Sequence, residues 1–151
     1  MPTPKETLSA FVPQRLLRHV GPQSTELAPF QSKMTAVTLL ADISGFTALT
    51  EQLSQDGAEG LETLTEILNE AFDIAISPAI ARGGDIATFA GDAFLVVWPQ
   101  VSSDGASQSQ PLALQQAACA ALDIQSNFRQ FTARRSVDIG LRIGIGVGAI
   151  D

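Results

Sequence analysis

The sequence predicts an α+β fold of the ferredoxin-like, palm-type class, a split βαβ arrangement that contains an antiparallel hairpin. Strand-like and helical segments follow one another in the order strand, two helices, two strands, helix, strand. Only Gly91-Asp92 separates the two middle strands, and a Gly-X pair is typical of a two-residue hairpin of type II′. The chain has 151 residues, of which 45% are hydrophobic, and this is enough for one compact core.

The first elements of the predicted domain follow Thr35. Residues 36–41 form an almost continuous apolar run, as expected for a strand that is buried on both faces. Ser44 is a predicted helix cap, and apolar residues then recur at helical spacing from Phe46 to Leu53. Asp56-Gly57 predicts the end of this helix.

A second helix is predicted from about Glu59 to Arg82, followed by the hairpin strands 85–89 and 93–98. We expect Pro78 to kink or interrupt the last turns of this helix and Gly83-Gly84 to end it. Its predicted apolar stripe comprises Leu61, Leu64, Leu68, Ala71, Phe72, Ala75, Ile76 and Ile80. In the second hairpin strand, Phe94 and Trp98 lie on the same face and are expected in the core.

A third helix is predicted from Pro111 to about Arg134, after a polar loop over residues 99–110. Its predicted apolar stripe comprises Leu114, Ala117, Ala118, Ala121, Leu122, Gln125, Phe128 and Phe131, in which Gln125 is an exception. The last predicted strand, 137–150, alternates isoleucine and valine with glycine. Because the chain stops directly after this strand, we expect a domain that is incomplete at its C-terminus.

Residues 1–34 differ from the rest and are predicted to be an N-terminal extension to the domain 35–151. They contain five of the eight prolines, with a possible short helix over 14–20. The net charge of −7 and the lack of a basic stripe disfavour a nucleic-acid polymer as partner. No apolar run approaches the roughly 20 residues of a membrane span, no signal-peptide pattern occurs, and a single cysteine excludes an internal disulfide. These features favour a cytoplasmic protein.

Two aspartates carry the candidate chemistry. Asp42 follows the apolar run and precedes a predicted helix N-terminus, where backbone N–H groups suit phosphate oxygens; the alternative is an aspartate that only caps the helix. Asp92 lies at the hairpin tip, and its alternative role is ordinary turn chemistry. Neighbouring strands lie about 4.8 Å apart. If the two strands are adjacent, both carboxylates can therefore bind a pair of metal ions about 3.5–4 Å apart.

Other motifs favour no rival chemistry. Arg82-Gly83-Gly84-Asp85 resembles the Gly-Gly-Asp signature of diguanylate cyclases, but it lies at a helix end rather than at a hairpin tip. His19 and Cys119 are each more consistent with a structural role than with catalysis. The sequence contains neither a Gly-x-x-x-x-Gly-Lys-Ser/Thr phosphate loop nor a Ser/His/Asp set.

Asp42-Ile43-Ser44-Gly45-Phe46-Thr47 together with Phe89-Ala90-Gly91-Asp92-Ala93 resembles the catalytic domain of class III adenylyl and guanylyl cyclases. The variant is most similar to the first cyclase domain of soluble adenylyl cyclases and their bacterial relatives. The two aspartates lie 50 positions apart (92 minus 42). The strand Leu141 to Gly148 also fits the family, and the resemblance covers roughly residues 35–151.

This resemblance implies conversion of ATP or GTP to the 3′,5′-cyclic nucleotide and pyrophosphate. It implies that Asp42 and Asp92 both bind two Mg²⁺ (or Mn²⁺) ions and that the Ile43 carbonyl completes a metal site. The β- and γ-phosphates would be held by the backbone N–H groups of Ser44, Gly45, Phe46 and Thr47. Because sites in this family form between two cyclase domains, the partners implied are a nucleoside triphosphate and a second cyclase domain, in cis or in trans.

One departure from the family pattern divides the functional hypotheses. Many members have a lysine four residues before the second aspartate, where this chain has Thr88. Threonine cannot supply that charge, which disfavours catalysis by a homodimer. The purine-selecting and transition-state residues of the family would lie beyond Asp151, so the choice between ATP and GTP stays open. The preferred hypothesis is the metal-binding half of a nucleotide cyclase, and the alternative is a catalytically inactive dimerisation or regulatory module.

Overall fold

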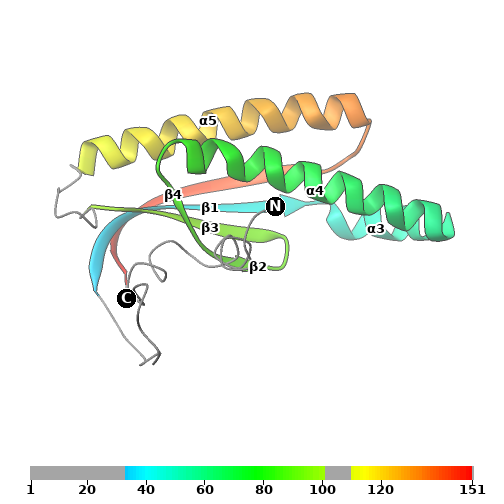
Figure 1. Cartoon of the computed structure of the whole chain (residues 1–151), viewed down its shortest axis with the longest axis horizontal. Helices are drawn as coiled ribbons and strands as arrows, with labels where there is room; N and C mark the ends of the chain where they lie inside the picture. Colours follow the sequence, from blue (N-terminus) through cyan, green and yellow to red (C-terminus); the bar gives the residue numbers. More distant parts are fainter. Residues whose placement is uncertain (1–32, 101–109, 151) are drawn as a thin grey trace, which may run out of the picture.

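The computed structural model describes residues 33–100 and 110–150, which form a four-stranded antiparallel sheet with helices on one face (Figure 1). The strand order is β2-β3-β1-β4, so the predicted ferredoxin-like split βαβ arrangement is confirmed. The predicted helix over 14–20, nearly all of the extension and most of the polar loop lie outside the described residues. The elements are β1 (Met34–Ser44), α3 (Phe46–Ser54), α4 (Gly57–Ala81), β2 (Asp85–Ala90), β3 (Ala93–Pro99), α5 (Gln110–Arg135) and β4 (Gly140–Ile150).

β1 is a central strand, paired with β3 on one side and with β4 on the other. The side chains of its odd-numbered residues from Val37 to Ile43 are fully buried, whereas Leu40 is 52% exposed and Asp42 is partly exposed. The expectation that the whole run is buried on both faces was therefore wrong. The helices cover one face only, and the other face, here called the open face, carries Leu40 and Asp42.

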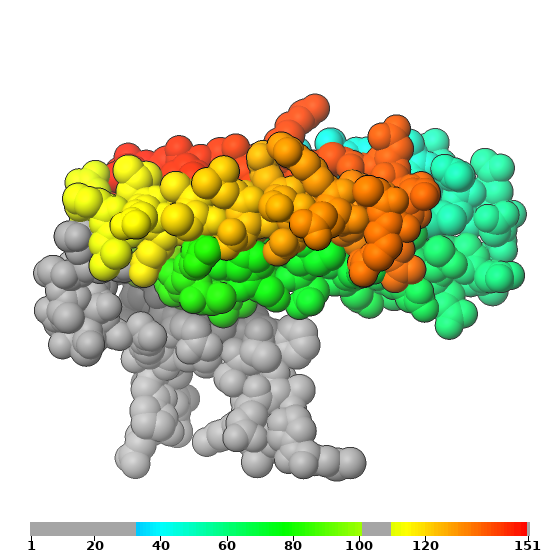
Figure 2. Space-filling model, turned by 90° about the horizontal axis from the view of Figure 1, so that it is seen from above, coloured from blue at the N-terminus to red at the C-terminus, as the bar shows by residue number. Residues whose placement is uncertain are grey.

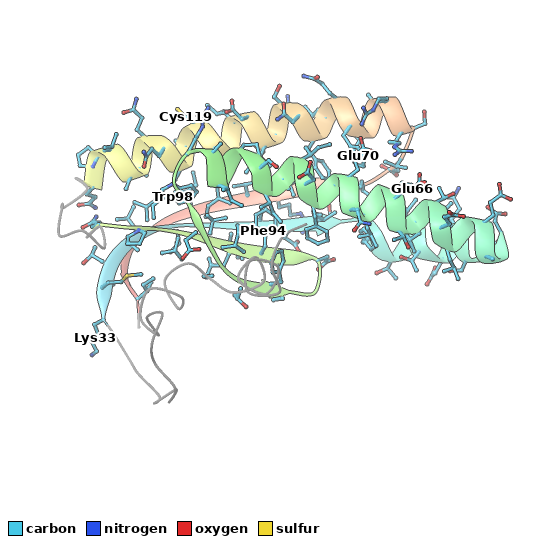
Figure 3. The ribbon with its side chains drawn as sticks, in the orientation of Figure 1. Lys33, Glu66, Glu70, Phe94, Trp98 and Cys119 are labelled. Carbon is cyan, nitrogen blue, oxygen red and sulfur yellow. The ribbon has the colours of Figure 1, made fainter. Side chains whose placement is uncertain are left out.

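The core lies between the sheet and the layer formed by α4 and α5. Arg82 pairs with Asp123 and Glu70 pairs with Arg135, so the two helices run antiparallel, side by side (Figure 2). Phe94 and Trp98 point from β3 toward the helices and are almost completely buried, which confirms their predicted core positions (Figure 3). The Trp98 indole N–H donates a hydrogen bond of 2.9 Å to the Arg82 carbonyl oxygen and ties β3 to the end of α4.

The apolar face predicted for α5 was wrong. Leu114 and Leu122 are 42% and 69% exposed. The residues that pack inward are Ala113, Ala117, Ala120, Ile124, Phe128 and Phe131, a stripe that shares only three members with the predicted one. An alanine-rich helix has small apolar residues on several faces, so hydrophobic periodicity alone did not identify the buried face.

The predicted apolar stripe of α4 agrees better with the structure than that of α5. Leu64, Ala71 and Ala75 are buried as expected, but Leu61 and Ile80, at the two ends of the predicted stripe, are each 54% exposed. The helix is not interrupted at Pro78 and continues to Ala81. It ends where predicted, with the Gly83 amide bonded to the Ile80 carbonyl and the Gly84 amide to the Ala79 carbonyl, each at 2.9 Å. This pair of bonds is a Schellman motif.

Candidate functional site

The turn between β1 and α3 differs from the prediction in a way that affects its chemistry. Ser44 is the last residue of β1, in register with Gly140, and is not the helix cap. Gly45 occupies the N-cap position with a φ of 87°, and no side chain caps α3. The first helical bond joins the Leu49 amide to the Gly45 carbonyl, so the amides before Leu49 have no intrahelical acceptor. Such free N–H groups, at the positive end of a helix, suit an anion.

Gly45 is required at this turn for two reasons. Its φ lies in the left-handed region, which residues other than glycine rarely adopt. A Cβ atom at this position would also lie 2.7 Å from the Asp138 carbonyl oxygen, in the segment that leads into β4. The turn is therefore in direct contact with the connection between α5 and β4.

A second core cluster packs against the turn between β1 and α3. It joins Ile43 at the end of β1, Leu49 of α3 and Ile139 just before β4 to apolar residues of α4 and α5. The remaining buried members are Leu64, Ile67, Ala71, Phe128 and Phe131. Because Ile43 is fully buried, its backbone, including the carbonyl that the family resemblance assigns to a metal site, has a fixed position.

The hairpin tip has the conformation predicted from its sequence. Gly91 has a φ of 67°, and Asp92 is not among the residues with positive φ. Positive φ at the first central residue alone is the property of a type II′ turn, whereas type I′ needs it at both. Asp92 is exposed at this tip, between β2 and β3.

The structure brings Asp42, Ile43 and Asp92 together. Asp42 is in register with Ala93, the residue after Asp92, and the Ile43 amide donates a hydrogen bond of 3.2 Å to the Asp92 carbonyl oxygen. Since the N–H and C=O of a strand residue point to the same side, the Ile43 carbonyl also faces the hairpin tip. Asp42 lies between two fully buried residues, Ala41 and Ile43, so its side chain projects from the open face.

Arg142 lies next to the candidate site and is a residue that the sequence analysis did not identify. It is in register with Asp42 on β4, so both side chains lie on the open face, and Arg142 is exposed. The available signal was its position as a single charged residue within a strand of Gly, Ile and Val. A cation next to a carboxylate pair adds a group that can contact phosphate oxygens.

The donor set fits magnesium bound together with a nucleotide. Within residues 33–100 and 110–150, no group of three or more His, Cys, Asp or Glu side chains is arranged to hold a metal. Mg²⁺ usually takes one or two carboxylates and completes its shell with water and substrate phosphates. Asp42, Asp92 and the Ile43 carbonyl match that pattern of hard oxygen donors.

Thr88 lies near this site on β2 and is exposed. It is in register with Leu95 of β3, which in turn is in register with Leu40 of β1. Its hydroxyl donates to the Phe89 carbonyl oxygen at 3.3 Å. The position that the resemblance associates with a lysine is thus occupied here by a neutral side chain, which Leu95 of β3 separates from the exposed Leu40.

The other sequence candidates lie elsewhere. Gly83-Gly84-Asp85 connects α4 to β2 as predicted and lies outside the hairpin tip. Cys119 is a free, partly buried cysteine on α5. In the part of the chain that the structure describes, no helix is both long enough and apolar enough to cross a membrane.

Comparison with known sequences gives one consistent result. The family model of the adenylate and guanylate cyclase catalytic domain matches residues 29–151. Adenylate cyclase type 10 of Homo sapiens is 33% identical over 158 aligned positions, which cover 99% of this chain and 9% of the human protein. The Mus musculus protein of the same name is 35% identical over 116 positions, covering 76% and 7%. The chain thus spans less than a tenth of the length of these relatives.

Solved structures give the same fold. The adenylyl cyclase CyaB from P. aeruginosa has a TM-score of 0.63 at 25% identity, covering 78% of this chain and 58% of that one. A bacterial light-regulated adenylyl cyclase has a TM-score of 0.70 at 20% identity, covering 96% and 40%. A class III adenylyl cyclase-like ATP-binding protein from Pseudomonas aeruginosa has a TM-score of 0.60 at 20% identity, covering 78% and 25%.

Proposed function

The chain belongs to the adenylate and guanylate cyclase catalytic domain family, and we propose that it supplies the two-metal half of a cyclase active site formed with a second cyclase domain. The reaction proposed is conversion of ATP or GTP to the 3′,5′-cyclic nucleotide and pyrophosphate, in the cytoplasm. The observation that carries the proposal is the register of Asp42 with Ala93, together with the bond from the Ile43 amide to the Asp92 carbonyl, because they make the two aspartates diagonal neighbours on adjacent strands.

Each part of the site has a proposed task. Asp42, Asp92 and the Ile43 carbonyl would hold two Mg²⁺ or Mn²⁺ ions. When bound, such ions lower the pKa of a hydroxyl and neutralise phosphate charge. The free amides of Gly45, Phe46 and Thr47 would donate hydrogen bonds to the β- and γ-phosphates, with Ser44, whose backbone faces β4, at the edge of this group of donors. We add Arg142, whose guanidinium would contact a phosphate oxygen from the open face.

The contribution of these residues to the rate is positioning. The ribose 3′-oxygen attacks the α-phosphorus while pyrophosphate leaves, so the reacting groups must be held in line and the phosphate charge must be stabilised. Ile43 is anchored in the core and Asp42 is fixed by pairing on both sides of β1, so the groups of this strand that we propose as metal ligands have preorganised backbone positions.

A second cyclase domain is part of the proposal because this chain lacks a charged group at position 88. Thr88 is exposed on β2, and its neutral side chain offers no cation for recognition of a purine at this position. We therefore propose that a different cyclase domain, in cis or in trans, supplies base recognition. Two neighbouring structures are the guanylate cyclase domain of RhGC from Catenaria anguillulae in complex with GTP and a non-canonical dimeric guanylyl cyclase domain of a RhoGC fusion protein from Blastocladiella emersonii, each 22% identical to this chain.

The same feature of Thr88 favours one alternative, a cyclase-fold module that binds nucleotide or dimerises without catalysis. The two hypotheses differ in what the aspartates do. In a cyclase, both are required for product, whereas an inactive module can bind a metal–nucleotide complex and release it unchanged.

The test is Mn²⁺- and ATP-dependent cyclic AMP production by the full-length protein, with GTP in parallel. Product that disappears in Asp42→Asn and in Asp92→Asn supports the proposal. Asp73→Asn is the matched control, because Asp73 is an exposed aspartate on α4 that bonds Ser77 and lies outside the site. Equal activity in Asp92→Asn and the parent protein would reject the proposal, and metal-dependent ATP binding without product would favour the inactive module.

A further inference from the structure

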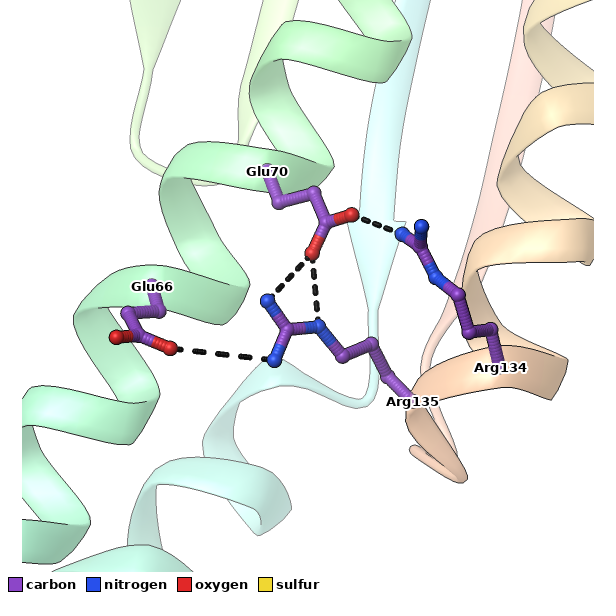
Figure 4. Close-up of polar contacts among 4 residues, drawn as sticks. All are labelled: Glu66, Glu70, Arg134 and Arg135. Carbon is purple, nitrogen blue, oxygen red and sulfur yellow. Dashed lines mark hydrogen bonds and ion pairs between the residues drawn. The ribbon is translucent and has the colours of Figure 1, made fainter.

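The last turn of α5 and the middle of α4 are joined by a charged cluster formed by Glu66, Glu70, Arg134 and Arg135 (Figure 4). The Arg135 guanidinium donates to one Glu70 oxygen through Nε at 2.8 Å and lies 2.7 Å from it through Nη2. Arg134 donates to the other Glu70 oxygen. The Glu66 carboxylate lies 3.9 Å from Arg135 Nη1 and completes the cluster.

The cluster lies directly before the segment that contacts the proposed phosphate-binding turn. α5 ends at Arg135, and Ser136 follows in the left-handed region with a φ of 54°. The Val137 amide then bonds back to the Thr132 carbonyl at 3.2 Å. Two residues after Ser136 comes Asp138. Its carbonyl oxygen is the nearest atom to a Cβ built on Gly45.

The connection from α5 to β4 is tightly packed against the core. Ile139 is 7% exposed and belongs to the same core cluster as Ile43, Leu49 and Phe131. A shift of the α5 end would therefore be carried to Asp138 and Ile139 and from them to the Gly45 turn, since a close-packed interior transmits displacement.

We propose that the Glu66–Glu70–Arg134–Arg135 cluster is a positioning device that holds the Gly45–Thr47 amides in place for the nucleotide triphosphate. It acts through the connection 136–139 and touches no substrate. The link to nucleotide rests on the proposed function; the link to the geometry of the turn does not.

The chain contains a matched control for this inference. Arg82 and Asp123 form a second ion pair between α4 and α5, further along the helix pair and remote from the Gly45 turn. Glu70→Gln and Asp123→Asn each remove one acidic charge from the same helix–helix interface with little change of shape. Both carboxylates are partly exposed, 26% for Glu70 and 48% for Asp123, so both variants should fold.

The first readout is hydrogen–deuterium exchange in protein without nucleotide at two bonded amides, Leu49, which donates to the Gly45 carbonyl, and Val137, which donates to the Thr132 carbonyl. We expect exchange there to increase about two- to fivefold in Glu70→Gln, the range that exposed ion pairs supply, and to stay unchanged in Asp123→Asn. Unchanged exchange in Glu70→Gln, or an equal increase in both variants, would overturn the inference.

The second readout is binding of Mg²⁺–3′-deoxy-ATP, an analogue that lacks the attacking hydroxyl, measured by calorimetry on the full-length protein. A loss of affinity of about two- to fivefold in Glu70→Gln alone is expected, from the same ion-pair range. If the parent protein does not bind the analogue, the proposed function fails, and the exchange result still decides whether the cluster positions the turn. If the parent binds and both variants match it, positioning of the triphosphate by this cluster is rejected.

Discussion

Gly45→Ala is the substitution whose cost the structure determines most directly. The left-handed φ of 87° costs an L-residue about 1–2 kcal/mol. The new Cβ would lie 2.7 Å from the Asp138 carbonyl oxygen, an overlap that a packed site relieves at about 1–3 kcal/mol. The reduced entropy of the unfolded alanine chain returns about 0.4–1 kcal/mol. We therefore expect a net destabilisation of about 1–4.5 kcal/mol. It can be measured by urea unfolding, with Trp98, the chain's single tryptophan, as the buried fluorescent probe.

Gly57→Ala separates the two contributions. Gly57 has a φ of 66° at the start of α4, but a Cβ there would meet nothing within 4 Å. Gly57→Ala should therefore have the cost of the left-handed backbone without the steric overlap. The free energies of unfolding of the two variants should differ by about 1–3 kcal/mol. For a chain of this size that difference corresponds to about 2–12 °C in melting temperature. If the two variants unfold at the same urea concentration, the contact between the Gly45 turn and Asp138 is not the constraint that we describe.

Three further predictions concern stability. Ser136→Gly should stabilise the protein by about 0.5–1 kcal/mol in the same urea titration, because glycine adopts the left-handed C′ position of a helix without strain. The hydrogen bond from Arg135, aided by the charge of Arg134 and opposed by desolvation, lowers the pKa of Glu70, so this carboxylate stabilises the fold above the usual glutamate value of 4.5. That stabilisation should be lost as the pH falls through the lowered pKa, and Glu70→Gln should make acid unfolding curves less steep there. Ile124→Ala should cost about 2–4 kcal/mol and Leu122→Ala less than about 0.5 kcal/mol. Equal costs would mean that α5 does not bury the face seen in the structure.

The order of elements could be predicted because local signals agreed with one another. Gly91-Asp92 indicated a hairpin, Gly83-Gly84 a helix end, and the apolar runs had strand or helix length. The buried face of α5 was not predictable in the same way. Gln125 interrupted the expected stripe, whereas Ile124, one position earlier, is fully buried. Gln125 itself is only partly buried, and as the one polar member of the predicted stripe it indicated that the centre of the buried face lay elsewhere.

The candidate site was predictable to the extent that its residues are close in sequence. Asp42 and Asp92 each belong to a short motif at the end of a strand, and only their adjacency needed the fold. The prediction that Ser44 caps the helix was wrong because capping depends on the φ of Gly45, which placed the glycine, not the serine, at the N-cap. Arg142 was missed because its proximity to Asp42 depends on the register between β1 and β4, which a single strand does not encode.

That register also explains why the geometry of the site is robust. Along β1, Ala41 and Ile43 are fully buried on either side of Asp42. A slip of one residue would turn Asp42 into the core and Ile43 out to solvent, and burying an unpaired carboxylate is strongly unfavourable. Core packing rather than the site residues therefore sets where the aspartates lie. Since Asp42 and Asp92 face solvent, removing either charge should leave the fold intact, and a loss of cyclase activity in their asparagine variants would report on chemistry rather than on unfolding.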